Sequence, residues 1–168
     1  MNRKIILLGL ILISFISCKE NENAELTELI TVVNQLKTDD NNEFLSTLKP
    51  SEKGLRLIFK DGESVNKVIA YSKMRWADIS KIPQNSMKPL TENAELKILT
   101  VSKSELKSGI TNGFPKEYLT IANHLQDGTK LYAMQYLNED GSEQKMRSVF
   151  FKTSDNWMIV PLAYKAFE

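Results

Sequence analysis

The sequence contains very little cysteine and histidine, the residues that form zinc sites of the His/Cys type and supply thiol nucleophiles. Its 168 residues include one cysteine, Cys18, and one histidine, His124. A structural disulfide needs a pair of cysteines, and zinc sites of the His/Cys type need several such ligands. The composition therefore excludes a disulfide-stapled domain and a His/Cys zinc site, and we expect no metal and no cofactor.

Motifs for the common cofactors and nucleophiles are also missing. The sequence has no glycine-rich phosphate loop, no dinucleotide-binding fingerprint and no nucleophile elbow. His124 lies near the end of a predicted helix, where we expect it to interact with the helix dipole rather than act as a catalytic base. The acidic pairs Asp39-Asp40 and Glu139-Asp140 lack the spacing of a calcium loop and lie in turn-like stretches. No catalytic residue is predicted.

Neither sign of charge dominates. The chain has 22 basic and 21 acidic side chains, and the lysines are scattered among glutamates. Nucleic-acid-binding domains typically show a basic stripe with interleaved aromatic residues. The sequence therefore predicts no nucleic-acid partner.

The N-terminus has the pattern of a secretion leader. Arg3 and Lys4 precede a twelve-residue apolar run, residues 5–16, and the small residue Ser17 follows it. A membrane-spanning helix needs about 20 apolar residues, so this run is too short to be a transmembrane anchor. A charged stretch begins directly after Cys18.

Residues 15–18, Phe-Ile-Ser-Cys, resemble the lipobox of bacterial lipoproteins. The resemblance implies that the Cys18 thiol receives a diacylglyceryl group, that the leader is cut after Ser17, and that the new amino group can receive a third acyl chain. Several chains give stable membrane attachment, whereas one chain holds only marginally. A plain secretory leader with a chance cysteine and an uncleaved anchor are the alternatives.

The residues after Cys18 indicate which membrane the lipoprotein is sent to and where its folded domain begins. Lys19 stands where many lipoproteins retained at the inner membrane have Asp, which favours the outer membrane, and the acidic residues near it are similar to a surface-display signal. The periplasmic side and the cell surface both remain open. We predict a signal peptide over 1–17, a lipidated cysteine and tether over 18–24, and one domain over 25–168.

The first half of this domain has the apolar period of helices. Leu26, Leu29, Val33 and Leu36 lie on one stripe. A short helix is predicted from about residue 43 to Pro50 and a longer one over 64–80. Periodicity leaves 54–59 undecided between strand and helix. After a proline-containing stretch, 83–91, the period changes to that of strands at 96–102, 130–138, 145–153 and 157–164, with a helix at 116–125. Pro161 predicts an edge strand or a bulge.

This order predicts an α+β fold, with N-terminal helices packed on one face of an antiparallel sheet of about four strands. The order resembles the cone-shaped folds of the nuclear-transport-factor and cystatin type. The C-terminal half, from Gly113 to Pro161, also resembles an uncharacterised family of secreted domains. Neither resemblance implies an activity.

The predicted sheet carries apolar residues on both faces, whereas packing by helices requires only one. We therefore predict a ligand or partner surface formed by Tyr132, Tyr136, Arg147 and Trp157, with aromatic walls and one cation. In the alternative interpretation, these aromatic residues are ordinary core and cross-strand pairs.

Three functions follow as hypotheses. The preferred one is a non-catalytic, lipid-anchored binding or accessory module of the cell envelope, attached to the membrane through Cys18 and recognising a protein or another envelope component through its sheet or an edge strand. The second is a small-ligand carrier or sensor with a cone-shaped pocket. The third is a hydrolase or isomerase with a carboxylate acid/base in that pocket, which requires an Asp or Glu with a perturbed pKa inside it.

Overall fold

The computed structural model describes residues 23–83, 86–146, 148–154 and 156–168. The chain divides into two compact units, residues 1–34 and 35–168, and the sheet belongs to the second. Residues 23–37 are helical, as their apolar period predicts. Cys18 and the predicted leader lie outside the described residues. In the part of the chain that is described, no helix has the length and apolar character needed to span a bilayer.

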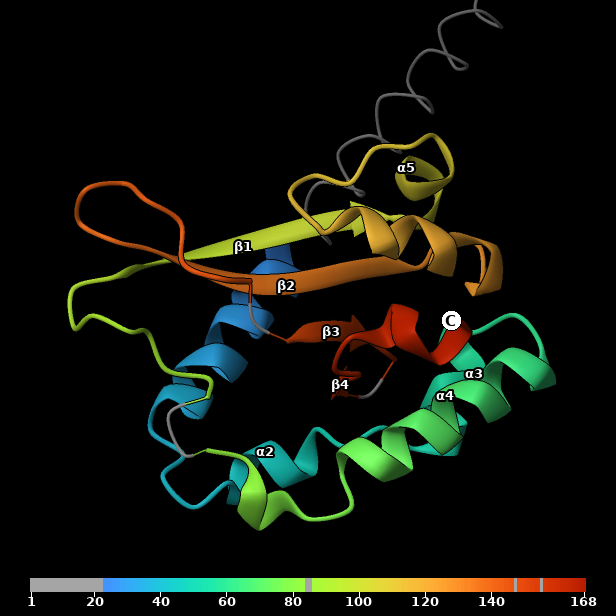
Figure 1. Cartoon of the computed structure of the whole chain (residues 1–168), viewed down its shortest axis with the longest axis horizontal. Coiled ribbons are helices and arrows are strands. Elements are labelled where there is room, and N and C mark those ends of the chain that lie inside the picture. Colours follow the sequence, from blue (N-terminus) through green and yellow to red (C-terminus); the bar gives the residue numbers. More distant parts are fainter. Residues whose placement is uncertain (1–22, 84–85, 147, 155) are drawn as a thin grey trace, which may run out of the picture. The chain divides into compact units, whose positions relative to one another are not determined.

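The second unit has an α+β fold with an antiparallel sheet of four strands, as predicted (Figure 1). The strands are β1 (Glu95–Ser102), β2 (Lys130–Leu137), β3 (Val149–Lys152) and β4 (Trp157–Ile159), and they lie in this order across the sheet. β3 and β4 are shorter than predicted. β4 is an edge strand that ends before Pro161, because proline has no N–H to give to a ladder.

After the helix over residues 23–37, four more helical elements precede the sheet in the described part of the chain: α2 (Glu43–Thr47), α3 (Glu52–Ile58), α4 (Gly62–Arg75) and the 3-10 turn η1 (Ile79–Lys81). The undecided segment is thus helical, because the Ser51 hydroxyl accepts a hydrogen bond from the N–H of Gly54 and caps α3. α4 ends earlier than predicted. The Asp78 side chain accepts from the N–H of Ser80 and begins η1, an example of a local side-chain bond competing with the helix.

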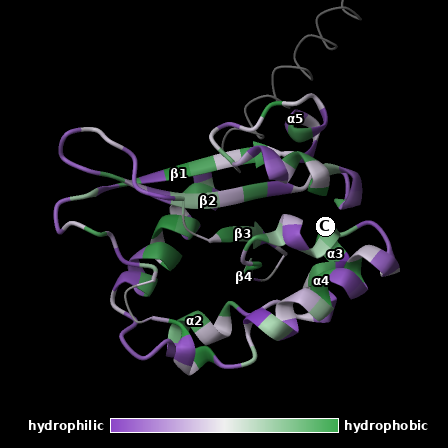
Figure 2. Cartoon of the chain, in the orientation of Figure 1, coloured by the Kyte–Doolittle hydropathy of each residue, from purple (hydrophilic) through white to green (hydrophobic). Residues whose placement is uncertain are grey.

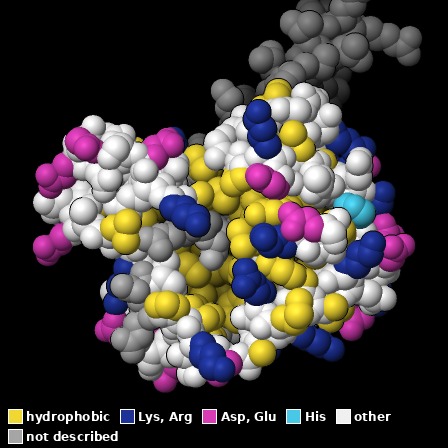
Figure 3. Space-filling view, viewed as in Figure 1, with side chains coloured by type: hydrophobic (Ala, Val, Ile, Leu, Met, Phe, Trp, Pro, Cys, Tyr) yellow, Lys and Arg dark blue, Asp and Glu magenta, His cyan; other side chains and the backbone are white. Residues whose placement is uncertain are grey.

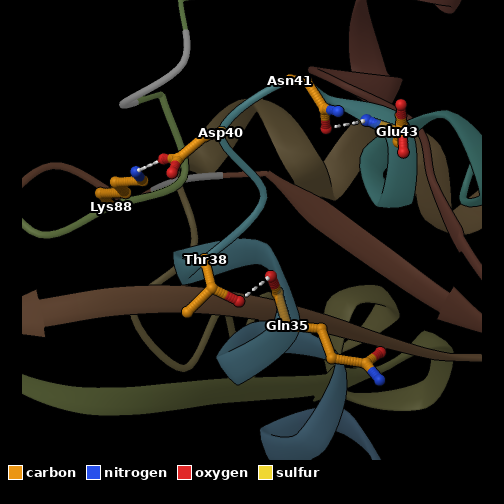
Figure 4. Close-up of polar contacts among 6 residues, drawn as sticks. All are labelled: Gln35, Thr38, Asp40, Asn41, Glu43 and Lys88. Carbon is orange, nitrogen blue, oxygen red and sulfur yellow. Dashed lines mark hydrogen bonds and ion pairs between the residues drawn. The ribbon is translucent and has the colours of Figure 1, made fainter.

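The turn before α2 explains the first acidic pair. The Asp39 carboxylate accepts hydrogen bonds from the N–H groups of Phe44 and Leu45, at 3.1 and 2.7 Å, and so caps this helix. Asp40 forms an ion pair with Lys88 (Figure 4). Both carboxylates therefore serve the local fold, and no group of three or more metal-ligating side chains occurs among the described residues.

Three further helical elements follow β1 in the described chain: α5 (Lys103–Lys107), η2 (Lys116–His124) and η3 (Ala163–Phe167). The predicted helix at 116–125 is a 3-10 helix. Helix α5 was not predicted, and η3 replaces the end of the predicted last strand. Ser102 and Glu105 form a capping box at the start of α5, and their spacing is the sequence signal that could have predicted this helix.

One face of the sheet packs against helical elements to form the main core. This face supplies alternate strand residues such as Leu131, Ala133 and Phe151, which cluster with buried residues of α3, α4 and η2. The rings of Phe59 and Phe151 lie 6.0 Å apart between the end of α3 and the sheet. Figure 2 shows hydrophobic residues along the middle of β1 and β2, with polar residues on the loops beyond them.

The opposite face of the sheet is also covered, which corrects the expectation of one open face. Tyr132, Phe150 and Ile159 are cross-strand neighbours on this face, and all three are buried. The N–H of Ile159 donates to the carbonyl of Leu48 at 2.8 Å. The chain between α2 and α3 thus lies beside β4, which the strand pattern does not reveal.

Candidate functional site

The predicted surface residues do not form an accessible surface. Tyr132, Tyr136 and Trp157 are 1%, 0% and 5% exposed, and Arg147 lies outside the described residues. The rings of Tyr132 and Trp157 meet edge to face at 5.1 Å. This packing corresponds to the alternative interpretation, in which the aromatic residues are core and cross-strand pairs.

Tyr136 is connected through Met87 to a pocket that was not predicted from the sequence. Its hydroxyl donates to the carbonyl oxygen of Met87 at 3.1 Å, and the Met87 side chain lines a pocket of about 400 Å³. This volume lies within the usual range for small-molecule sites, about 300 to 1,000 Å³. Two other hollows formed by described residues are smaller, at about 240 and 220 Å³.

We call this site the Tyr118 pocket. Its walls come from the end of α4, the segment before β1, η2, the segment before β3 and the turn after β4. The lining residues are Arg75, Ile82, Ser86, Met87, Tyr118, Lys145, Met146, Ser148, Pro161 and Leu162. Figure 3 shows a hollow near the centre of this face with hydrophobic side chains gathered in it and Lys or Arg side chains beside it.

The walls of the pocket are tied to each other and to the sheet. The Ser148 hydroxyl lies 3.6 Å from the Met87 sulfur, which joins the segment before β3 to the segment before β1. Met87 is in turn held by Tyr136 from β2. The pocket is therefore largely preformed, as small-molecule sites usually are.

Leu162 shows backbone strain at the edge of the pocket. Its φ of 50° and ψ of 49° place a residue with a large side chain in the left-handed region, where glycine or asparagine is usual. Conformations of this kind cost about 1 kcal/mol or more and occur preferentially at functional sites. The turn after Pro161 is thus a feature that points to function at this pocket.

Tyr118 supplies a buried polar group to the pocket. Its ring packs edge to face on Phe114 and Tyr164, at 5.5 and 4.9 Å. Its hydroxyl is fully buried and donates to no acceptor among the described residues, although the backbone of Ala163 lies near its oxygen. Burial raises the pKa of Tyr118 above its ordinary range, so the hydroxyl keeps its proton and remains a donor.

The charged residues of the pocket are both basic. Lys145 is exposed and has no ion-pair partner among the described residues, and the Arg75 Nε donates to the Tyr71 hydroxyl at 3.0 Å. None of the described lining residues is acidic. The pocket therefore combines apolar walls with a positive charge.

His124 lies in a second polar arrangement, away from this pocket. Its Nδ1 is 2.9 Å from the hydroxyl of Ser64 in the first turn of α4, and its ring stacks on Phe167 at 3.9 Å. Ser64 is 2% exposed, and Asp61 binds the backbone N–H of Ser64. Burial lowers the pKa of His124. The histidine is thus neutral at pH 7 and structural, which corrects the expected role as a cation at a helix end.

No described carboxyl group with a resolved shift in its pKa has the raised pKa of a general acid. Wherever a shift in a carboxyl pKa is resolved, the pKa is lowered, chiefly by hydrogen bonds from serine or lysine neighbours. A general acid at neutral pH requires a raised pKa. The described part of the chain therefore offers no support for the hydrolase or isomerase hypothesis.

Comparison with known proteins finds no matching family model, no similar curated protein and no similar solved structure. The resemblances to lipoproteins and to cone-shaped folds rest on the sequence alone, and the function must be argued from the pocket.

Proposed function

We propose that this chain is a lipid-anchored protein of the bacterial outer membrane whose domain binds a small, partly apolar ligand in the Tyr118 pocket and carries out no reaction on it. The observation that carries the binding proposal is a preformed pocket of about 400 Å³ whose lining includes a buried hydroxyl with no acceptor among the described residues. This is the carrier or sensor hypothesis, now with a named site.

The chemistry of the lining supports binding rather than catalysis. Met87, Met146 and Leu162 provide adaptable apolar contacts, while a few polar groups can fix the orientation of a ligand. The described lining contains no cysteine, and no histidine or carboxylate that could act as a general base beside its two serine hydroxyls.

The anchor proposal rests on the sequence around Cys18. A lipidated cysteine followed by a short polar tether would hold the domain close to the outer membrane. A ligand taken up there would come from the envelope or from outside the cell.

Methionine methyl NMR offers a local test of binding. The chain has six methionines; Met87 and Met146 line the pocket, whereas Met74 is 71% exposed on α4. The full chain, labelled with ¹³C-methyl methionine and held in phosphatidylcholine nanodiscs, would be titrated with 1-octanol and with octanoate. We expect at least one of these probes to shift the Met87 and Met146 signals and to leave Met74 unchanged.

Two blocking variants, Ser148→Trp and Ile82→Trp, each place a large side chain in the lining of the pocket. Each is expected to abolish the shifts, while the signals of the buried Met134 and Met158 report that the variant is folded. Ser46→Trp, at an exposed position of α2, is the matched control. If neither probe moves Met87 or Met146 in the unmodified chain, the binding proposal is wrong.

A further inference from the structure

The hydrogen-bonding groups of the Tyr118 pocket are unbalanced. Arg75 and Lys145 only donate, and the Tyr118 hydroxyl is a protonated donor without an acceptor among the described residues. The described lining contains no carboxylate and no amide side chain that would act as a strong acceptor. A ligand that satisfies this site must supply acceptor oxygens.

The charges favour an anion. No described carboxylate is ion-paired with Arg75 or Lys145, in contrast to Lys88, Lys97 and Lys103, which each have an acidic partner. The bond from Arg75 to Tyr71 uses only its Nε, and the remaining guanidinium N–H groups suit the two oxygens of a carboxylate or phosphate.

We propose, on the basis of the binding function above, that the Tyr118 pocket takes an amphipathic anion: an oxyanion head held by Arg75, Lys145 and the Tyr118 hydroxyl, with an apolar tail against Ile82, Met87, Met146 and Leu162. The head group is a carboxylate or a phosphate monoester, since both present the same acceptor oxygens to these donors.

The test compares octanoate, octyl phosphate and 1-octanol, which share a tail and differ in the head. Affinity is read from the Met87 and Met146 methyl shifts of the full chain in phosphatidylcholine nanodiscs. We expect at least one anion to bind about tenfold or more tightly than 1-octanol, since each exposed ion pair contributes up to about fivefold. The relative strength of octanoate and octyl phosphate identifies the head group.

Ionic strength and substitutions distinguish the contribution of the charged head group to binding from that of the apolar tail. Raising the ionic strength from about 0.01 to about 1 M, which shortens the screening length from about 30 to about 3 Å, should weaken binding of the anion and not of octanol. Arg75→Gln, Lys145→Gln and Tyr118→Phe should each weaken anion binding at least about threefold, whereas Lys165→Gln, at an exposed position on η3 outside the lining, should not.

Two different failures can be told apart. If octanol binds the pocket as tightly as both anions, or if none of the three lining variants weakens the anion, the inference about the head group is wrong and the binding function stands. If no probe reaches the pocket, the proposed function fails together with the inference.

Discussion

His124 shows how the surroundings of a single side chain decide what it does. Near the end of a helix an exposed histidine would be stabilised as a cation. Here the ring is partly buried between Ser64 and Phe167, and burial is the largest cause of its lowered pKa. The sequence locates this residue at the helix end, whereas its partners come from segments about 60 and 43 positions away in the chain.

The lowered pKa predicts a pH dependence of stability. Because the unfolded chain takes up a proton at the ordinary pKa of about 6.5, before the folded chain does, the free energy of unfolding should fall as the pH drops below about 6.5. His124→Gln should flatten this part of the curve, measured by urea unfolding between about pH 7 and pH 5.5. NMR titration of the single histidine checks the pKa directly, and an equal slope in both proteins would contradict the prediction.

At the scale of elements, α3 and α5 illustrate two kinds of sequence signal. The capping box of Ser102 and Glu105 is local and is legible in the sequence, although the prediction passed over it. The choice between strand and helix for α3 could not be made from six residues, because both periods fit so short an apolar run. In the helical conformation, Leu55 and Ile58 are both buried in the core against the sheet.

Gly54 ties α3 to the sheet and gives a prediction about packing. In a helix alanine is more favourable than glycine by about 1 kcal/mol, but a Cβ at Gly54 would overlap the Met158 sulfur from β4. The overlapping atoms are the end of a flexible side chain, so part of the clash can relax, and Gly54→Ala should lower the free energy of unfolding by about 1 kcal/mol, measured by denaturant unfolding.

Gly62→Ala, at the first residue of α4, is the matched control. A Cβ there meets nothing within 4 Å, so the substitution should be neutral or stabilise the protein by up to about 1 kcal/mol. Met158→Val in the Gly54→Ala background should recover part of the loss if the overlap is the cause. A Gly54→Ala protein as stable as the Gly62→Ala protein would disprove this account of the contact.

At the scale of the whole molecule, the two parts of the proposal depend on different regions. The anchor depends on Cys18 and the residues before it, which lie outside the described part of the chain. Binding depends on the pocket in the unit 35–168. Each part can therefore be tested without the other.

Cys18→Ser tests the anchor. Removing the only thiol should abolish incorporation of labelled fatty acid and release the protein from the membrane fraction, measured by metabolic labelling and fractionation in a bacterial host. Ser14→Ala, which leaves the cysteine in place, should keep both. Undiminished labelling of the Cys18→Ser chain would overturn the lipoprotein assignment.

The sequence by itself determined the α+β class and the strands β1 and β2, and it limited the last strand to an edge strand or a bulge. These features depend on local periods and on residues such as Pro161, whose constraints act within a few positions of the chain. Only the tertiary structure decided that the aromatic residues Tyr132, Tyr136 and Trp157 are buried. It also decided that the pocket is formed by five segments between Arg75 and Leu162. Such a site depends on contacts between distant segments, and no local period encodes them.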